Sequence, residues 1–220
     1  MKFEDIGKKE KFLIARTSTL YILEDGNLLK LFKNPRDLYE IDRFKYFLEY
    51  NNDSFIFPFE FIYDSNNFYG YITKRVYSNT LESVFAKSNL INLSTSSLKL
   101  EKDIDYISEG GIVLYDFHDE NILYGNKKYS VIDHDENGIC KSSSDTKELN
   151  RKRHRIMIGK CFEKNIKNNK DTKYILEKIM KYKYMNIKPS EMIITIKEDM
   201  ERYYKEDINN IEEMNNIIRR

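Results

Sequence analysis

The chain has 220 residues, of which 40% are hydrophobic and 33% charged, and its formal net charge is +1. This composition excludes a disordered chain, and the neutral total gives no overall attraction to nucleic acid or to an anionic membrane surface. No apolar run is long enough to span a membrane, so we expect a cytoplasmic protein with no membrane or nucleic-acid partner. Cys140 and Cys161 are the only cysteines, which argues against a disulfide framework or a structural zinc site.

The first third of the chain predicts a small antiparallel sheet with one helix. Gly26 follows an aspartate between two β-rich runs, and an Asp-Gly pair in that place favours a hairpin. Residues 34–37 break the strand pattern, and the apolar spacing after them indicates an amphipathic helix of about four turns. The five expected strands lie at residues 11–15, 20–24, 28–32, 55–64 and 68–76.

From residue 78 onward the apolar spacing becomes helical, with one interruption. Two helices are expected before Gly110 and Gly111, which together form a stop signal. A hairpin of two short strands follows and ends at Asp133, and helices fill the chain from Lys147 onward. The two helices before the stop signal cover residues 81–85 and 93–108.

The residue types that carry chemistry gather in the segment 111–138, GIVLYDFHDENILYGNKKYSVIDHDENG. Asp116 is followed five residues later by Asn121, and Asp133 stands at the end of an apolar strand. Phosphoryl transfer needs a carboxylate to orient the attacking hydroxyl, oxygen ligands for Mg²⁺ and cations for the phosphates. A D-x-x-x-x-N pattern by itself is common in structural turns. Here it is informative because Asp133 follows it in the order and at the spacing that this chemistry needs.

The loop D-F-H-D-E-N, closed by V-I-D, resembles the catalytic loop and the metal-binding aspartate of the protein-kinase-like superfamily. His118 makes the loop similar to those of small bacterial kinases and of aminoglycoside and choline kinases. The resemblance implies that Asp116 accepts the proton of the acceptor hydroxyl and that Asn121 and Asp133 hold Mg²⁺ or Mn²⁺. It implies one bilobal α+β domain over residues 1–220. An antiparallel β-sheet lobe with one helix would cover about 1–77, and a compact, mainly helical lobe about 78–220.

The resemblance extends to the N-terminal strands. Lys30, in L-L-K-L-F, matches the lysine that contacts the α- and β-phosphates of ATP. Glu40, on the following helix, matches the carboxylate that pairs with that lysine, and both residues are counted with Asp116 as catalytic. The other nucleotide-binding positions that the resemblance implies are Ala15, Ser18, Thr73, Arg75 and Val76.

The chain departs from the family pattern in several places. Residues 14–20 contain no glycine where the family has a glycine-rich loop, and Tyr115 stands where regulated protein kinases have arginine. D-H-D replaces D-F-G, and no A-P-E motif follows Asp133. These departures weaken the expectation of a peptide-binding platform.

We expect ATP·Mg-dependent transfer of the γ-phosphate to a hydroxyl acceptor, as in a Ser/Thr protein-kinase-like enzyme. Two alternatives stay open. A pseudokinase that binds nucleotide as a scaffold is favoured by the missing glycines, and a small-molecule kinase by the form of the loop. The basic run at residues 151–155, RKRHR, is interpreted as a charged helix face and not as an anion-binding surface.

Overall fold

The computed structural model describes residues 9–218 and shows an α+β architecture with a five-stranded antiparallel sheet. The chain divides into two compact units, residues 1–77 and 78–220, here called the N-terminal and C-terminal units. Within the described residues, no helix is both long and apolar enough to cross a membrane.

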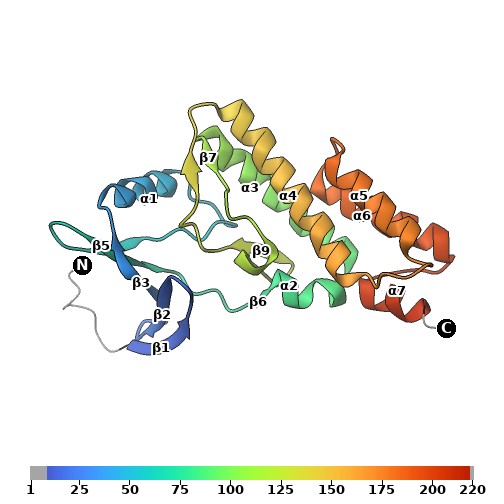
Figure 1. The fold of residues 1–220 in the computed structure, drawn as a ribbon, viewed down its shortest axis with the longest axis horizontal. Helices are drawn as coiled ribbons and strands as arrows, with labels where there is room; N and C mark the ends of the chain where they lie inside the picture. Colours follow the sequence, from blue (N-terminus) through green and yellow to red (C-terminus); the bar gives the residue numbers. More distant parts are fainter. Residues whose placement is uncertain (1–8, 219–220) are drawn as a thin grey trace. The chain divides into compact units, whose positions relative to one another are not determined.

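The N-terminal unit is an antiparallel sheet with one helix (Figure 1). Its strands, in the spatial order β1-β2-β3-β5-β4, are β1 (Lys9–Ile14), β2 (Ser18–Leu23), β3 (Leu28–Arg36), β4 (Glu60–Tyr63) and β5 (Phe68–Thr73). The helix α1 covers Tyr39–Glu49. The predicted order of three strands, a helix and two strands is therefore confirmed, although several of its boundaries are wrong.

Several elements end at other residues than the sequence predicts, β5 among them, which ends at Thr73. β3 continues through Pro35 to Arg36, where the sequence predicts a break. Proline is tolerated there because the pairing of β3 with β5 is irregular between Leu31 and Arg36, so no regular ladder bond is lost. β4 is shorter than the predicted strand at 55–64, and α1 has 11 residues, closer to three turns than to four.

Aromatic side chains hold α1 against the sheet. Phe44 is fully buried and packs on Phe61, Phe68 and Tyr71 with ring centroids 5.3–6.1 Å apart. Tyr71 is the register partner of Lys30, and directly opposed residues in an antiparallel pair point to the same face. The lysine therefore lies on the sheet face that α1 covers.

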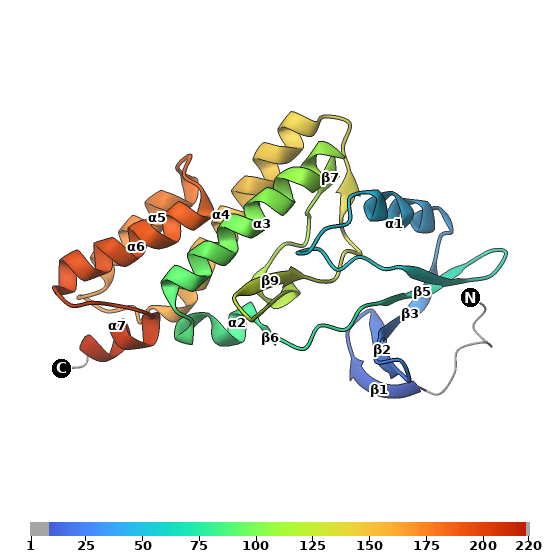
Figure 2. The ribbon, with the colours of Figure 1, turned by 180° about the vertical axis from the view of Figure 1, so that it is seen from behind.

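The C-terminal unit is mainly helical. Its helices are α2 (Leu81–Val84), α3 (Leu90–Glu109), α4 (Ser143–Asn165), α5 (Lys173–Tyr184), α6 (Pro189–Tyr204) and α7 (Ile211–Ile217). Single 3₁₀ turns occupy Phe85–Lys87 and Asp119–Asn121. Helices α3 and α4 run side by side in both views (Figures 1 and 2). All the helices expected from the apolar spacing are present.

Two small sheets interrupt these helices. One contains β6 (Asn79–Thr80), β8 (Ile122–Gly125) and β9 (Lys128–Val131), and the other pairs β7 (Ile112–Val113) with β10 (Gly138–Ile139). The hairpin of β8 and β9 is confirmed. The two-residue strands are new, because so short a strand carries no periodic signal in the sequence.

Gly111 joins α3 to β7 and permits a close backbone contact. Its φ is +72°, a left-handed conformation that residues with a side chain rarely adopt. A Cβ atom at this position would lie 2.0 Å from the carbonyl oxygen of Cys140. The glycine therefore lets β7 and β10 pair, and β7 leads directly into the loop that carries Asp116.

Candidate functional site

Asp116, His118 and Asn121 form a hydrogen-bonded cluster between β7 and β8. The Asn121 amide Nδ2 donates to the Asp116 carboxylate Oδ2 at 2.9 Å and to the Asp116 carbonyl at 3.2 Å. His118 Nε2 lies 3.3 Å from the other carboxylate oxygen and 3.1 Å from Asn121 Nδ2. The Asp116 side chain is 44% exposed, so the carboxylate is oriented by its neighbours and remains accessible.

The hairpin of β8 and β9 brings Asp133 next to this cluster. Ile122 pairs with Val131, and the Ile132 amide donates to the Asn121 carbonyl at 2.9 Å. Asp133 follows at once with a φ of +58° and an exposed side chain. Left-handed residues other than glycine are uncommon and concentrate at functional sites. The pairing thus places two predicted metal ligands on neighbouring segments of one unit.

The donor set at Asn121 and Asp133 suits a divalent cation that arrives with a phosphate ligand. The Asn121 amide uses Nδ2 on Asp116, and its Oδ1 accepts no hydrogen bond from any residue between 9 and 218. The same residues contain no cluster of three or more His, Cys, Asp or Glu side chains that could hold a metal alone. Mg²⁺ is usually held by one or two protein ligands together with substrate phosphates and water.

Lys30 is almost fully buried in the N-terminal unit, with 5% of its surface exposed. Its ammonium lies 5.7 Å from the centroid of the Tyr71 ring. The Glu40 carboxylate forms ion pairs with Arg36 at 3.2 Å and with Arg43 at 3.0 Å. The resemblance implies that Glu40 pairs with Lys30, and the structure does not bear this out. The Glu40 carboxylate instead accepts hydrogen bonds from Arg36, at the end of β3, and from Arg43, on α1.

Thr73 and Arg75 lie at the end of β5, where the resemblance implies the adenine pocket. The Thr73 hydroxyl donates to the Ile56 carbonyl at 3.3 Å. The Arg75 guanidinium lies over the rings of Phe12 and Tyr77, 5.2 and 4.4 Å from their centroids. Val76 is half-buried.

The turn between β1 and β2 is closed by its own backbone. The Ala15 amide donates to the Ser18 carbonyl at 2.9 Å, and Ser18 is buried with 1% exposure. The Lys33 amide donates to the Thr17 carbonyl at 2.9 Å, which ties the turn to β3. Tight closure of this kind is compatible with the absence of glycine from the turn.

Asn150, which the sequence analysis does not single out, holds the loop before Asp116. It lies on α4 and is fully buried. Its Oδ1 accepts from the Leu114 amide at 2.9 Å, and its Nδ2 donates to the Ile112 carbonyl at 2.7 Å and to the Ser108 hydroxyl at 3.0 Å. No local sequence signal marks such a residue, since its partners lie more than 35 positions away.

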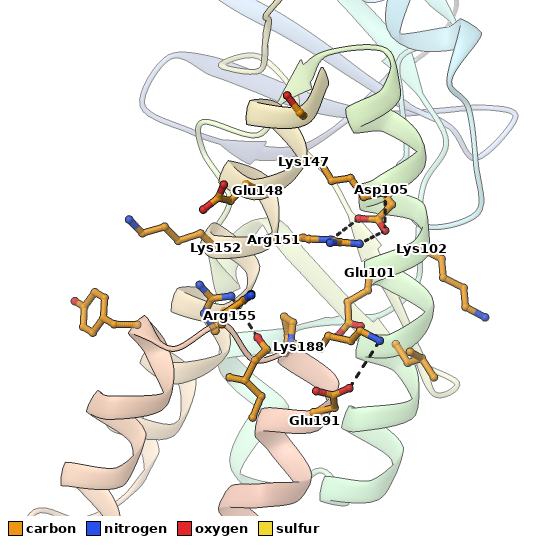
Figure 3. Close-up of a pocket in the computed structure, with 16 residues that line it drawn as sticks. Glu101, Lys102, Asp105, Lys147, Glu148, Arg151, Lys152, Arg155, Lys188 and Glu191 are labelled. Atoms are coloured by element: carbon orange, nitrogen blue, oxygen red, sulfur yellow. Dashed lines mark hydrogen bonds and ion pairs between the residues drawn. The ribbon is translucent and has the colours of Figure 1, made fainter. Parts of the chain in front are cut away.

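The basic run at 151–155 does not form a continuous charged surface. Arg151 pairs with Asp105 on α3 at 2.5 Å (Figure 3). Arg155 donates to the main-chain carbonyls of Lys183 and Ile187 at 3.1 and 3.3 Å. Arg153 donates to the Leu114 carbonyl at 2.5 Å. His154 is fully buried 3.1 Å from the Ser97 hydroxyl, and burial lowers its pKa to about 3. Four of the five residues in the run therefore form contacts with different parts of the C-terminal unit.

A groove of about 960 Å³ lies along α3, α4 and the connection between α5 and α6 (Figure 3). Glu101 lies in its wall, where it accepts from the Ser190 amide at 2.7 Å and where burial raises its pKa. None of the site residues predicted from the sequence lines this groove.

No family model matches the chain, and no curated protein matches it significantly. The candidate site is therefore defined by its own geometry. Asp116, Asn121 and Asp133 adjoin one another in the C-terminal unit, and Lys30 is buried in the N-terminal unit.

Proposed function

We propose that the protein is a kinase, a phosphotransferase that moves the γ-phosphate of ATP to a hydroxyl acceptor. The observation that carries the proposal is the arrangement of Asp116, Asn121 and Asp133. The first two share a hydrogen bond of 2.9 Å, and the third follows a residue whose amide bonds to Asn121. An accessible carboxylate beside two oxygen ligands for a cation supplies what phosphoryl transfer requires from a protein.

In this mechanism Asp116 orients the acceptor hydroxyl and takes its proton. The hydroxyl oxygen forms a bond to the γ-phosphorus while the bond from that phosphorus to the bridging oxygen breaks, and ADP leaves. His118 and Asn121 hold the Asp116 carboxylate from both of its oxygens. Asn121 Oδ1 and Asp133 would hold a Mg²⁺ ion, which would supply positive charge to offset the negative charge of the phosphates.

Lys30 would contact the α- and β-phosphates. A buried ammonium in a sheet is a fixed donor, and it could form a charge-assisted hydrogen bond to a phosphate oxygen. Glu40 is left out of this step because its carboxylate is held by Arg36 and Arg43.

A small-molecule acceptor is a second candidate beside a protein acceptor. α4 begins at Ser143, so only residues 134–142 separate Asp133 from that helix, and part of this segment pairs as β10. So short a connection leaves little chain for a platform that binds an extended peptide. The reaction at Asp116 would be the same for either acceptor.

The test is transfer of label from γ-labelled ATP with Mg²⁺ or Mn²⁺, measured as labelled product and as released phosphate. Asp116→Asn and Asp133→Asn remove one charge each and keep the side-chain size, and asparagine also tolerates the left-handed backbone at 133. We expect each to reduce turnover by about 10²-fold or more. Glu120→Ala and Glu136→Ala remove exposed carboxylates nearby and should leave turnover unchanged.

Nucleotide binding is tested separately by thermal unfolding. Mg·ATP at a hundredfold excess over its dissociation constant stabilises the folded state by about 2.7 kcal/mol, a rise in Tm of about 5–10 °C for a chain of this size. Lys30→Met should remove most of that rise. If Mg·ATP does not raise the Tm and no label is transferred, the proposal is refuted. If Mg·ATP raises the Tm but no label is transferred, the protein is a pseudokinase.

A further inference from the structure

A small pocket of about 150 Å³ opens beside Asp116. Tyr115, Phe117 and His118 of the loop line one side, and Arg153 lies in the wall that α4 contributes. The loop residues directly flank Asp116, and His118 Nε2 is 3.3 Å from its carboxylate. At ~30 Å³ for each water molecule, the volume admits one small charged group with a few attached atoms.

The pocket holds two cations, Arg153 and Lys160, that form no ion pair with any carboxylate of the described residues. Arg153 makes one hydrogen bond, to the Leu114 carbonyl, and its guanidinium lies 4.7 Å from the centroid of Tyr115. Burial lowers the pKa of Arg153, so this cation has lost part of its hydration.

The one carboxylate in the pocket lining, that of Asp119, does not neutralise these cations. Both of its oxygens accept from Lys164, at 2.9 and 3.2 Å. Arg153 and Lys160 therefore leave the pocket with an excess of positive charge, and a partly desolvated guanidinium is well suited to bind an oxyanion.

We propose that this pocket binds an anionic group of the acceptor, a phosphate, sulfate or carboxylate. The same acceptor molecule then presents its hydroxyl to Asp116. The role given to Asp116 rests on the proposed function, whereas anion binding by Arg153 and Lys160 does not. The acceptor is accordingly an alcohol that also carries a negative charge.

The larger groove of Figure 3 is lined by charges of both signs, several of which pair with one another. Lys147 and Arg151 both pair with Asp105, and Lys188 pairs with Glu191 at 3.7 Å. Of these two pockets, the small one adjoins the loop that carries Asp116, which favours it as the anion site for the acceptor.

Anion binding is tested first, without nucleotide and at constant ionic strength. Inorganic phosphate or sulfate is titrated into ¹⁵N-labelled protein, and the Nε–H signal of Arg153 and the amide signal of Phe117 are followed. We expect saturable shifts of both signals. Lys160→Glu should weaken binding about tenfold or more, because it replaces a cation of the pocket with an anion that repels the ligand.

Lys152→Glu is the matched control. It makes the same change of charge on the same helix, but Lys152 is exposed and lies in the larger groove (Figure 3). Its affinity for phosphate should stay within about twofold of the wild type. Absence of a saturable shift, or an equal loss in both variants, overturns the anion site.

The acceptor role is tested with matched pairs of alcohols and labelled ATP. Glycerol 1-phosphate is compared with glycerol, and a serine peptide flanked by glutamate with the same peptide flanked by glutamine. In one of the two pairs we expect turnover with the charged acceptor to exceed turnover with the uncharged acceptor at least tenfold. Lys160→Glu should reduce this preference. The pair that shows the preference identifies the source of the anion. Turnover without any preference overturns the acceptor role. Saturable anion binding without ATP turnover leaves the anion site standing and rejects the proposed function.

Discussion

Replacing Asn150 with alanine tests how the loop that carries Asp116 is held in place. The change removes one acceptor and one donor from a fully buried position. The Leu114 amide and the Ile112 carbonyl then lose their side-chain partner, and each unsatisfied buried group costs about 1–3 kcal/mol. The Ser108 hydroxyl still donates to the Ile104 carbonyl at 2.6 Å. We therefore expect the free energy of unfolding to fall by about 2–6 kcal/mol.

Two measurements check this value. Urea unfolding followed by far-UV circular dichroism gives the free energy, and hydrogen exchange of the Leu114 amide reports the local contact. Asn168→Ala is the control, because Asn168 is exposed and surface substitutions usually change stability by less than about 0.5 kcal/mol. A loss below about 1 kcal/mol for Asn150→Ala, or unchanged protection of Leu114, would refute the reasoning. Turnover should fall with stability, since Leu114 lies two residues before Asp116.

Three further changes have defined outcomes. Burial lowers the pKa of His154 to about 3, against 6.5 in the unfolded chain, so protonation of this imidazole favours unfolding. The contribution of the neutral His154 to the free energy of unfolding is therefore fully present above pH 6.5. We expect that free energy to fall by about 3 kcal/mol from pH 7 to pH 4. In His154→Gln, the free energy of unfolding measured with urea should fall less between pH 7 and pH 4, by that same amount. An unchanged dependence of the free energy on pH would argue against a buried neutral imidazole. Gly111→Ala should destabilise by about 2–5 kcal/mol through left-handed strain and the contact with Cys140, and a smaller loss in thermal unfolding would contradict it. Lys164→Met should cost about 1–2 kcal/mol because it strands the buried Asp119, whereas Lys45→Met, at an exposed pair, should change almost nothing.

The local pattern of the sequence was enough for most elements of the fold. Alternating and helical spacing of apolar residues predicted the five strands, α1 and the helices of the C-terminal unit, because both periodicities are set within a few residues of chain. The spacing of Asp116 and Asn121 also identified two residues that do meet, since a single short loop joins them. Asp133 could be predicted beside them because a hairpin brings its two strands into register.

Contacts between distant parts of the chain were decided only by the tertiary structure. Arg153 and Asn150 look like ordinary polar residues of a helix, yet both bind the segment before Asp116. The physical reason is that a side chain acquires a partner from the packing of whole elements, whereas periodicity specifies only which face of one element is apolar.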